Sequence, residues 1–459
     1  MKSQLAAVLL IFLLPNSLSM GQVSAATQNP PALEPSVAAQ GSTVQQTSPA
    51  PPPITVRLSV KDAEHTALKN NPAISVARLN ALASEQVVRE VRSTYWPQAY
   101  ASLTAVSARD NSRITAGALN NPIIYSRAAG GGTISQLLTD FGHTSNLVAS
   151  SRLQAKAEEQ NAVATKEDVL AAVDQAFYGA LQTHAVLQVA EQTVASRQLL
   201  SDQVAALTKS KLKSELDLSF ANVNLAQAKL LYLDALNNDK AAMAGLSAIL
   251  GYPALENFEL VPDTEPLMPP PADVNELITD ALAKRPEILV IEFESESAEK
   301  LHLANRDQMF PTISALAAFG DSPVRDDRVY GPYSAVGVNV QIPVFNGFLY
   351  SARSRESDIR AQAEHQRLAD LRNRIARDVR TSWLSASTAF DRVHVSEQLL
   401  AQANLALDLA QTRYKLGLSS IVELSQAQLQ QTQAQISNSQ AEYEYRLSLA
   451  ILRYQTAGL

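Results

Sequence analysis

Ser-Thr-Tyr-Trp-Pro at residues 93–97 recurs 214 residues later as Asp-Gln-Met-Phe-Pro at 307–311. Asn-Asn-Pro at 70–72 recurs at the same interval as Lys-Arg-Pro at 284–286. Farther along, Val-Ala-Glu-Gln at 189–192 matches Val-Ser-Glu-Gln at 395–398, now 206 residues apart. An internal duplication on this scale constrains the architecture before any local pattern does. We therefore expect two internal repeats, of which the first is longer between its strands.

Candidate strands follow each aromatic-proline pair. The segment Val-Gly-Val-Asn-Val-Gln-Ile at 336–342 alternates apolar with small or polar residues, the lipid-out and water-in pattern of a membrane barrel. A second strand follows Pro311, and the first-repeat counterparts are roughly 97–107 and 131–139. Gly-Gly-Gly at 130–132 is interpreted as a flexible tip loop before its strand. The smallest usual membrane barrel has about eight strands, so the four strands of one chain cannot close one. Closure therefore requires more than one chain, and three chains would give twelve strands.

Two very long helical stretches are predicted at about 143–208 and 348–414, because neither contains a proline. Each is followed by a turn, at 209–214 and 415–420, and by a returning helix to about 250 and 454. A helix of this length reaches roughly 100 Å and needs neighbours along its whole length. The sequence therefore predicts a mixed, mostly α-helical fold in which an antiparallel coiled-coil hairpin occurs twice.

The N-terminal residues predict export. Lys2 precedes an apolar run at 5–14, and small residues lead to a cleavage point after Ala25, so 1–25 is expected to be a signal peptide. The other predicted segments are a disordered, proline-rich lead-in at 26–56, a first repeat at 57–250, a proline-rich linker at 251–272 and a second repeat at 273–456. The sequence contains no cysteine, so we expect no lipidation of the mature N-terminus. The net charge is −7, so we expect no nucleic-acid partner.

The turn Arg-Tyr-Lys-Leu-Gly-Leu-Ser-Ser-Ile-Val-Glu-Leu-Ser-Gln-Ala-Gln at 413–428, with the duplicated helix–strand–strand–helix order, resembles the TolC-like outer-membrane efflux factor family. The resemblance implies a homotrimer whose twelve strands form one transmembrane β-barrel among outer-membrane lipid. Its helices would continue as a trimeric α-barrel across the periplasm. It also implies a passive exit duct of a tripartite efflux or type I secretion system, gated at its periplasmic tip. The implied partners are a periplasmic adaptor protein and an inner-membrane transporter.

The resemblance carries over to particular residues at the helical turns. Tyr414 matches a tyrosine that ties the closed tip, while Asp217 and Glu423 fall where acids face the narrow mouth. Ser419 and Gln426 stand where a basic residue and a second acid are often found. The residues expected to dock the adaptor are Lys211, Leu212, Lys213, Ser214, Leu416, Gly417, Leu418 and Ser419. The first turn lacks a glycine, which leaves room for a different tip geometry.

Simpler explanations stay open for these residues. Gly417 supplies a left-handed residue at a helix end, Asp217 and Glu423 stabilise helix starts, and lysines in a turn are commonly just solvated. Aromatic side chains at the strand ends are interpreted as a membrane-interface belt, with ordinary packing as the alternative. These are Tyr95, Trp96, Phe310, Tyr333, Phe345 and Phe348.

Short matches to enzyme motifs occur without the other motifs that an active site would need. Asp-Phe-Gly at 140–142 lacks the other kinase motifs, and the six histidines show no metal-ligand spacing. We therefore predict no catalytic site, no cofactor and no metal. Two other functions remain as alternatives. An exported structural coiled-coil stalk would explain the helices but has no use for the strands, and an exported enzyme on a helical scaffold has no assignable site.

Overall fold

The computed structural model describes residues 56–110, 112–113, 123–254, 256, 258–263, 265–325, 327 and 331–457. All of them belong to one compact unit, 54–459, and only this unit is considered below. The predicted signal peptide and nearly all of the proline-rich lead-in lie outside the described residues.

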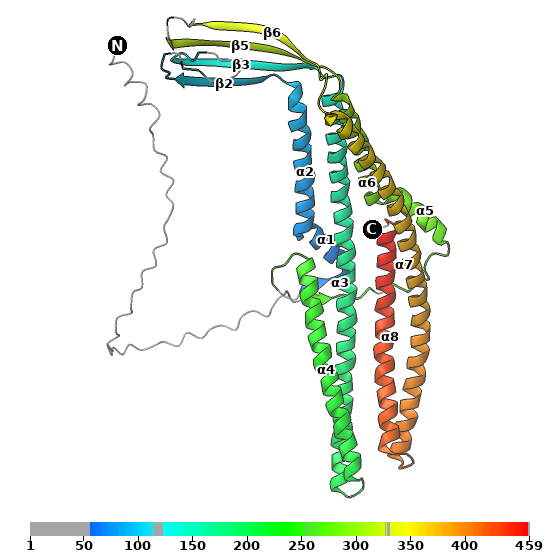
Figure 1. The fold of residues 1–459 in the computed structure, drawn as a ribbon. Helices are drawn as coiled ribbons and strands as arrows, with labels where there is room; N and C mark the ends of the chain where they lie inside the picture. The colour runs from blue at the N-terminus through cyan, green and yellow to red at the C-terminus, as the bar shows by residue number, and fades with distance from the viewer. Residues whose placement is uncertain are drawn as a thin grey trace, which may run out of the picture. The chain divides into compact units, whose positions relative to one another are not determined.

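Two antiparallel helical hairpins dominate the unit (Figure 1). The first joins α3 (His143–Lys209) to α4 (Glu215–Ile249), and the second joins α7 (Leu349–Lys415) to α8 (Ile421–Gln455). The long helices begin and end within one residue of the predicted positions. Helix α3 also packs against α8, so the two hairpins lie side by side. This contact supplies the lateral support that helices of 67 residues need.

Shorter helices pack alongside the parts of α3 and α7 that lie nearer the strands (Figure 1). They are α1 (Val60–Asn70), α2 (Pro72–Arg92), α5 (Val274–Lys284) and α6 (Pro286–Asp307), with a short 3-10 turn η1 at Ser93–Tyr95. The predicted helix breaks at 70–72 and 284–286 are confirmed, because Pro72 and Pro286 each occupy the first turn of a new helix. Asn71 caps α2 by accepting a hydrogen bond from the backbone N–H of Ala73 at 2.9 Å.

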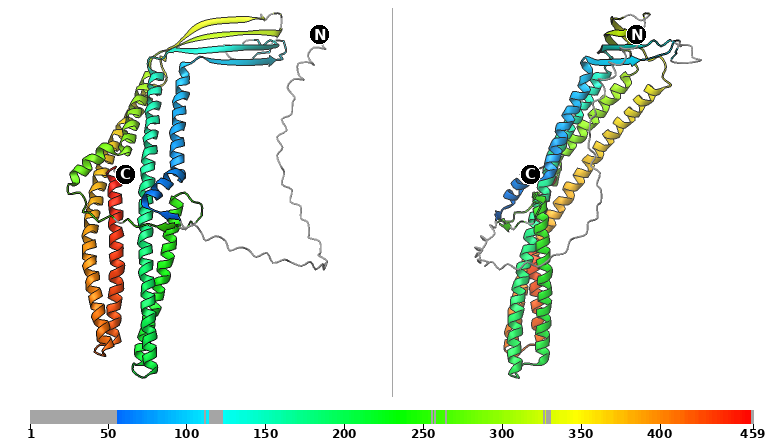
Figure 2. Two further views of the ribbon diagram at one scale, coloured as in Figure 1. Left: turned by 180° about the vertical axis from the view of Figure 1, so that it is seen from behind. Right: turned by 90° about the vertical axis from the view of Figure 1, so that its left-hand side faces the viewer.

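Four antiparallel strands form a sheet at the end of the unit opposite the helical turns (Figures 1 and 2). They are β2 (Gln98–Val106), β3 (Arg127–Thr139), β5 (Thr312–Arg325) and β6 (Tyr333–Gln341), in the spatial order β2-β3-β5-β6. The predicted strands are therefore present, although β3 begins four residues earlier than expected and β6 ends before Ile342. Strands β2 and β6 are the two edges, each with one side unpaired in this sheet.

The prediction of a flexible loop at Gly130–Gly132 was wrong, because all three glycines lie inside β3. Gly131 and Gly132 pair with Gly320 and Phe319 of the neighbouring strand β5. A Cβ atom on Gly132 would stand 2.8 Å from the Phe319 ring, and one on Gly131 would collide with the hydroxyl of Tyr333. The glycines thus make room for aromatic rings that lie across the sheet.

A two-stranded parallel sheet lies beside the helices. It pairs β1 (Val56–Leu58) with β4 (Phe258–Leu260), so the last residue of the predicted lead-in and part of the predicted linker belong to strands. The largest apolar core lies beneath it, where Val173, Phe177 and Leu246 are fully buried. None of the helices in the described ranges contains an apolar segment of the length that a bilayer-spanning helix requires.

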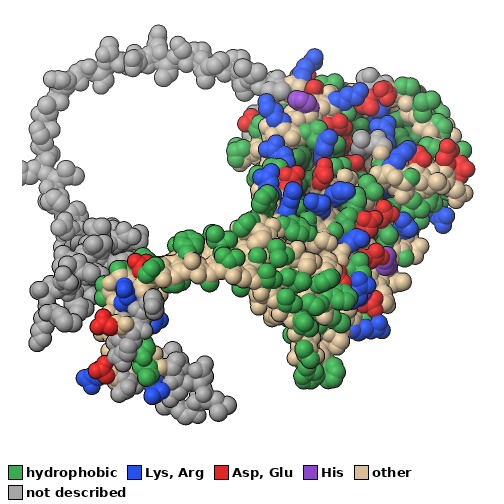
Figure 3. Space-filling view, turned by 90° about the horizontal axis from the view of Figure 1, so that it is seen from above, with side chains coloured by type: hydrophobic (Ala, Val, Ile, Leu, Met, Phe, Trp, Pro, Cys, Tyr) green, Lys and Arg blue, Asp and Glu red, His purple; other side chains and the backbone are tan. Residues whose placement is uncertain are grey.

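Charge is distributed unevenly over this unit. Figure 3 shows hydrophobic and uncharged side chains along the sheet, whereas charged side chains gather on the helices and at the far end of the strands. The paired segments 98–106, 128–138, 312–320 and 333–341 contain no Asp, Glu, Lys or Arg. At about 3.3 Å per residue, a nine-residue strand is roughly 30 Å long, and a tilted transmembrane β-strand needs about 9–11 residues.

Candidate functional site: the helical tips and the groove between them

The two turns at the helical tips have the same backbone geometry. Gly417 takes a left-handed φ of +74°, and Lys211, which stands at the equivalent place in the first turn, takes +59°. In the second turn, the N–H of Leu418 donates to the carbonyl of Arg413 at 2.8 Å, and that of Gly417 donates to Tyr414 at 3.1 Å. The first turn has the same two bonds. Both are Schellman endings, so the missing glycine does not change the tip geometry.

The two predicted pore acids are held in different ways. Asp217 accepts hydrogen bonds from the backbone N–H of Ser214 at 3.0 Å and from its hydroxyl at 2.8 Å, which completes a capping box at the start of α4. Glu423 is exposed and lies 3.5 Å from the guanidinium of Arg413. The helix-start explanation therefore describes Asp217 well. The sequence did not indicate Arg413 as a partner of Glu423. Its positive charge reduces the net charge near the Glu423 carboxylate.

Tyr414 lies between the two tips and is 6% exposed. The ammonium nitrogen of Lys213 stands 3.9 Å from the centre of its ring, a cation–π contact that joins the first turn to α7. Burial, and secondarily the charge of Asp217, raises the pKa of the Tyr414 hydroxyl. That hydroxyl is buried and has no hydrogen-bond partner in the described part of the chain. The structure thus brings Tyr414, Lys213 and Asp217 together, but the residues that the structure describes supply no acceptor for the predicted tie.

The predicted docking residues form an exposed apolar tip. Leu212, Leu416 and Leu418 are each about two thirds exposed or more, at 70%, 68% and 67%. Lys213 and Ser419 are half-buried, and the remaining candidates are exposed. Exposed leucines clustered at two adjacent turns are unusual for a solvated surface and are typical of a contact site.

The predicted belt aromatics are all exposed, from 42% for Tyr95 to 78% for Phe345. Most of them lie near the junction of the sheet with the helices, where Phe345 and Phe348 stack edge to face with centroids 5.7 Å apart. Tyr333 lies elsewhere, because it pairs with Gly320 near the middle of β5 and covers the glycines described above. Packing within the sheet therefore accounts for part of its position.

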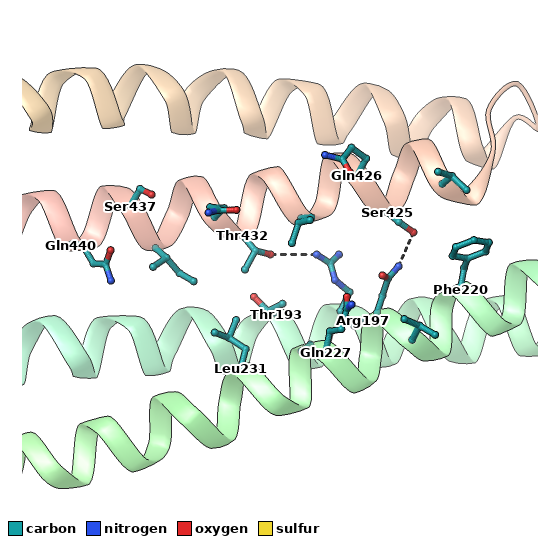
Figure 4. A pocket seen from close by; sticks show the side chains of 17 residues that line it. Thr193, Arg197, Phe220, Gln227, Leu231, Ser425, Gln426, Thr432, Ser437 and Gln440 are labelled. Atoms are coloured by element: carbon teal, nitrogen blue, oxygen red, sulfur yellow. Dashed lines mark hydrogen bonds between the residues drawn. The ribbon is translucent and has the colours of Figure 1, made fainter.

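Sequence reasoning missed a groove between the hairpins, with a volume of about 660 Å³, formed by α3, α4 and α8 (Figure 4). Arg197 of α3 lies in it, is 7% exposed and donates to the hydroxyl of Thr432 at 3.3 Å. Burial lowers the pKa of this guanidinium to about 10. The buried positions of α3 in this region, at 190, 193, 197, 201 and 204, recur at helical spacing, and Arg197 is the one cation among them.

A second buried ionisable group lies near the upper end of the hairpins. Asp174 of α3 is 5% exposed, and burial together with the facing carboxyl of Glu64 raises its pKa to about 7. The cation of Arg453 opposes that shift. The described residues contain no group of three or more His, Cys, Asp or Glu side chains that could hold a metal ion.

The family model for outer membrane efflux proteins matches residues 64–252 and 277–458. This chain belongs to the outer membrane efflux protein family. The chain is 23% identical to the outer membrane efflux protein BepC of Brucella suis over 374 residues, which span 79% of the chain and 77% of BepC. It is also 25% identical to CyaE of Bordetella pertussis over 390 residues, 83% of the chain and 80% of CyaE.

Among solved structures, the fold is similar to that of the Campylobacter jejuni CmeC outer membrane channel. The two superpose with a TM-score of 0.76 at 16% identity over 87% of this chain and 85% of CmeC. Family membership confirms the predicted resemblance and its consequences for location and general role. The protein is an outer-membrane exit duct that serves efflux or secretion.

Proposed function

We propose that this family member is a homotrimer whose twelve strands, four from each chain, close into one barrel in the outer membrane. The uncharged four-stranded sheet with two open edges is the observation that carries the proposal. An unpaired backbone group in lipid costs several kcal/mol, so β2 and β6 need partners there. Pairing β2 of one chain with β6 of the next removes every edge. The hairpins then line one continuous duct across the periplasm.

The helical tips are the proposed gate. Each chain contributes one Asp217 and one Glu423, so a threefold assembly sets like charges around a narrow mouth, which favours cations over anions. The buried hydroxyl of Tyr414 supports a role in closure, because a donor without an acceptor among the described residues of its own chain is suited to an acceptor from a neighbouring subunit. Opening separates that contact and widens the mouth.

The exposed leucines of the two turns are the proposed contact for a periplasmic adaptor, which couples the duct to an inner-membrane transporter. CmeC is described as an outer membrane channel and BepC as an outer membrane efflux protein, which agrees with a passive conducting role for this chain. An exported structural stalk is not favoured, because it leaves the four strands unused.

Planar-bilayer conductance of the purified protein tests this function. Reconstituted protein is expected to give discrete single-channel steps that favour cations, from particles with the mass of three chains. A particle of trimeric mass that never conducts, even after voltage is applied in both directions, would rule out the duct. The alternative stalk predicts protein that stays in the soluble fraction and inserts into no bilayer.

A further inference from the structure

The groove between the two hairpins contains one buried cation and no acid. Its volume is about 660 Å³, and its walls come from α4 between 220 and 231 and from α8 between 422 and 440. Thr193 and Arg197 of α3 form the floor. Every other lining side chain is uncharged, so the guanidinium of Arg197 sets the electrostatic character of this space. We call this feature the hairpin groove.

Arg197 lacks the partners that a buried guanidinium usually has. Its side chain is 7% exposed and reaches from α3 towards α8, where it donates a hydrogen bond to the neutral hydroxyl of Thr432 at 3.3 Å (Figure 4). This is its one side-chain hydrogen bond within the described part of the chain, although a guanidinium carries five N–H donors. Burial alone lowers the pKa of Arg197, so no nearby carboxylate offsets the loss of water.

The acids around the hairpin groove are directed elsewhere. On α3, Glu191 and Asp202 are six and five residues from Arg197, whereas side chains that share a helix face are three or four residues apart. On α8, Glu423 lies 3.5 Å from the guanidinium of Arg413 and outside the lining. A buried charge without a counterion is destabilising, so proteins usually pair it or use it to bind an ion of opposite charge.

The chemistry of the hairpin groove favours an anion with two adjacent oxygen atoms. A guanidinium is planar and presents parallel N–H groups, which match one edge of a carboxylate or a phosphate. Gln227 of α4 also lines the groove, and its amide N–H group is a further donor. A volume of about 660 Å³ accommodates such a small ion together with water, and no acid in the lining repels it.

We propose that the hairpin groove is a binding site for a small oxyanion of the phosphate or carboxylate class, held by Arg197. The bound anion supplies the missing counterion. Because Arg197 also bonds to Thr432, a neutralised guanidinium stabilises the packing of α3 in the first hairpin against α8 in the second. Binding requires neither conduction nor another protein, so this proposal and the proposed duct can fail separately.

Equilibrium dialysis with radiolabelled inorganic phosphate tests the proposal on the full-length protein purified in detergent. At an ionic strength held constant with chloride, one phosphate is expected to bind to each chain. Arg197→Met should weaken this binding at least tenfold. Arg380→Met is the matched control, because Arg380 is exposed on α7 and lies outside the groove, and it should leave the binding unchanged.

Gln227→Glu tests the same site without removal of the buried arginine. The new carboxylate is expected to pair with Arg197 and to exclude phosphate, whereas Gln227→Met adds no charge and should retain most of the binding. Gln227 is exposed on α4, so this pair of variants gives an answer even if Arg197→Met fails to fold.

Competition identifies the class of anion. Displacement of phosphate by acetate would show that carboxylates bind at the same place, whereas displacement by sulfate but not by acetate would restrict the site to tetrahedral oxyanions; either result supports the proposal. The proposal is overturned if the unaltered protein binds no phosphate. Equal binding in Arg197→Met, or unchanged binding in Gln227→Glu, also overturns it.

Discussion

Lys211 and Gly417 occupy the same place in the two tip turns, and both have a left-handed backbone, with φ of +59° and +74°. Glycine adopts this conformation without steric penalty, whereas a residue with a Cβ atom loses roughly 1 kcal/mol there. The first turn thus has the same backbone shape although lysine is disfavoured in the left-handed conformation.

Lys211→Gly is expected to stabilise the first tip by up to about 1 kcal/mol, since it relieves the left-handed strain. Gly417→Ala should destabilise the second tip by a similar amount for the opposite reason. Thermal unfolding of each variant, followed by circular dichroism, measures the two changes in stability. Equal and opposite shifts confirm the shared geometry, and destabilisation of the tip by Lys211→Gly would contradict it.

Tyr414→Phe is expected to shift the gate towards its open state by about 0.5–1.5 kcal/mol, the range for one hydrogen bond. The shift should appear only in the assembled protein, because no acceptor for the hydroxyl lies in the described part of its own chain. Open probability in planar bilayers measures it. Tyr350→Phe, at the opposite end of α7, is the control. Unchanged open probability in Tyr414→Phe would remove this residue from the gate.

Glu423 and Arg413 should affect ion selectivity in opposite directions. The two side chains form an exposed pair at 3.5 Å, so each offsets the charge of the other. Glu423→Gln is expected to lower the permeability ratio of cations to anions, and Arg413→Gln is expected to raise it. Reversal potentials in a salt gradient give both ratios. A permeability ratio that is unchanged in both variants would show that the pair lies outside the conducting mouth.

Asp174 should make stability depend on pH. Its pKa of about 7 in the folded chain lies above the ordinary value of 3.8, so the folded state holds this proton more tightly than the unfolded state. The stability it provides is therefore complete below pH 4 and is lost as pH rises to about 7, by roughly 1.4 kcal/mol for each pKa unit. Asp174→Asn should flatten this slope in chemical denaturation between pH 4 and 8. An unchanged slope would contradict the assignment.

The long helices and their ends could be predicted because proline positions and repeat spacing mark them without reference to tertiary contacts. The start of β3 could not, because Gly130–Gly132 has the local preferences of a loop. Only the rings of Phe319 on β5 and Tyr333 on β6, which lie across these positions, explain glycine there.

The candidate site shows the same limit. The sequence indicated Tyr414, Asp217 and Lys213 through the turns, and the structure places them together. It did not indicate Arg197, although the residue lies on the buried stripe of α3, because nothing in the local sequence separates a buried cation from one at a solvated edge. The groove is formed by helices from both halves of the chain, so its lining emerges only in three dimensions.

The most direct test of the central claim is disulfide trapping between β2 and β6 of neighbouring subunits. The chain has no cysteine, so Ser102→Cys in β2 can be combined with single cysteines at 335, 337 or 339 in β6 without interference. Mild oxidation of the outer-membrane fraction is expected to yield covalent dimers and trimers, and nothing larger, for at least one pair. Monomers alone from every pair, at full expression and with both cysteines reactive, would contradict a barrel closed by three chains.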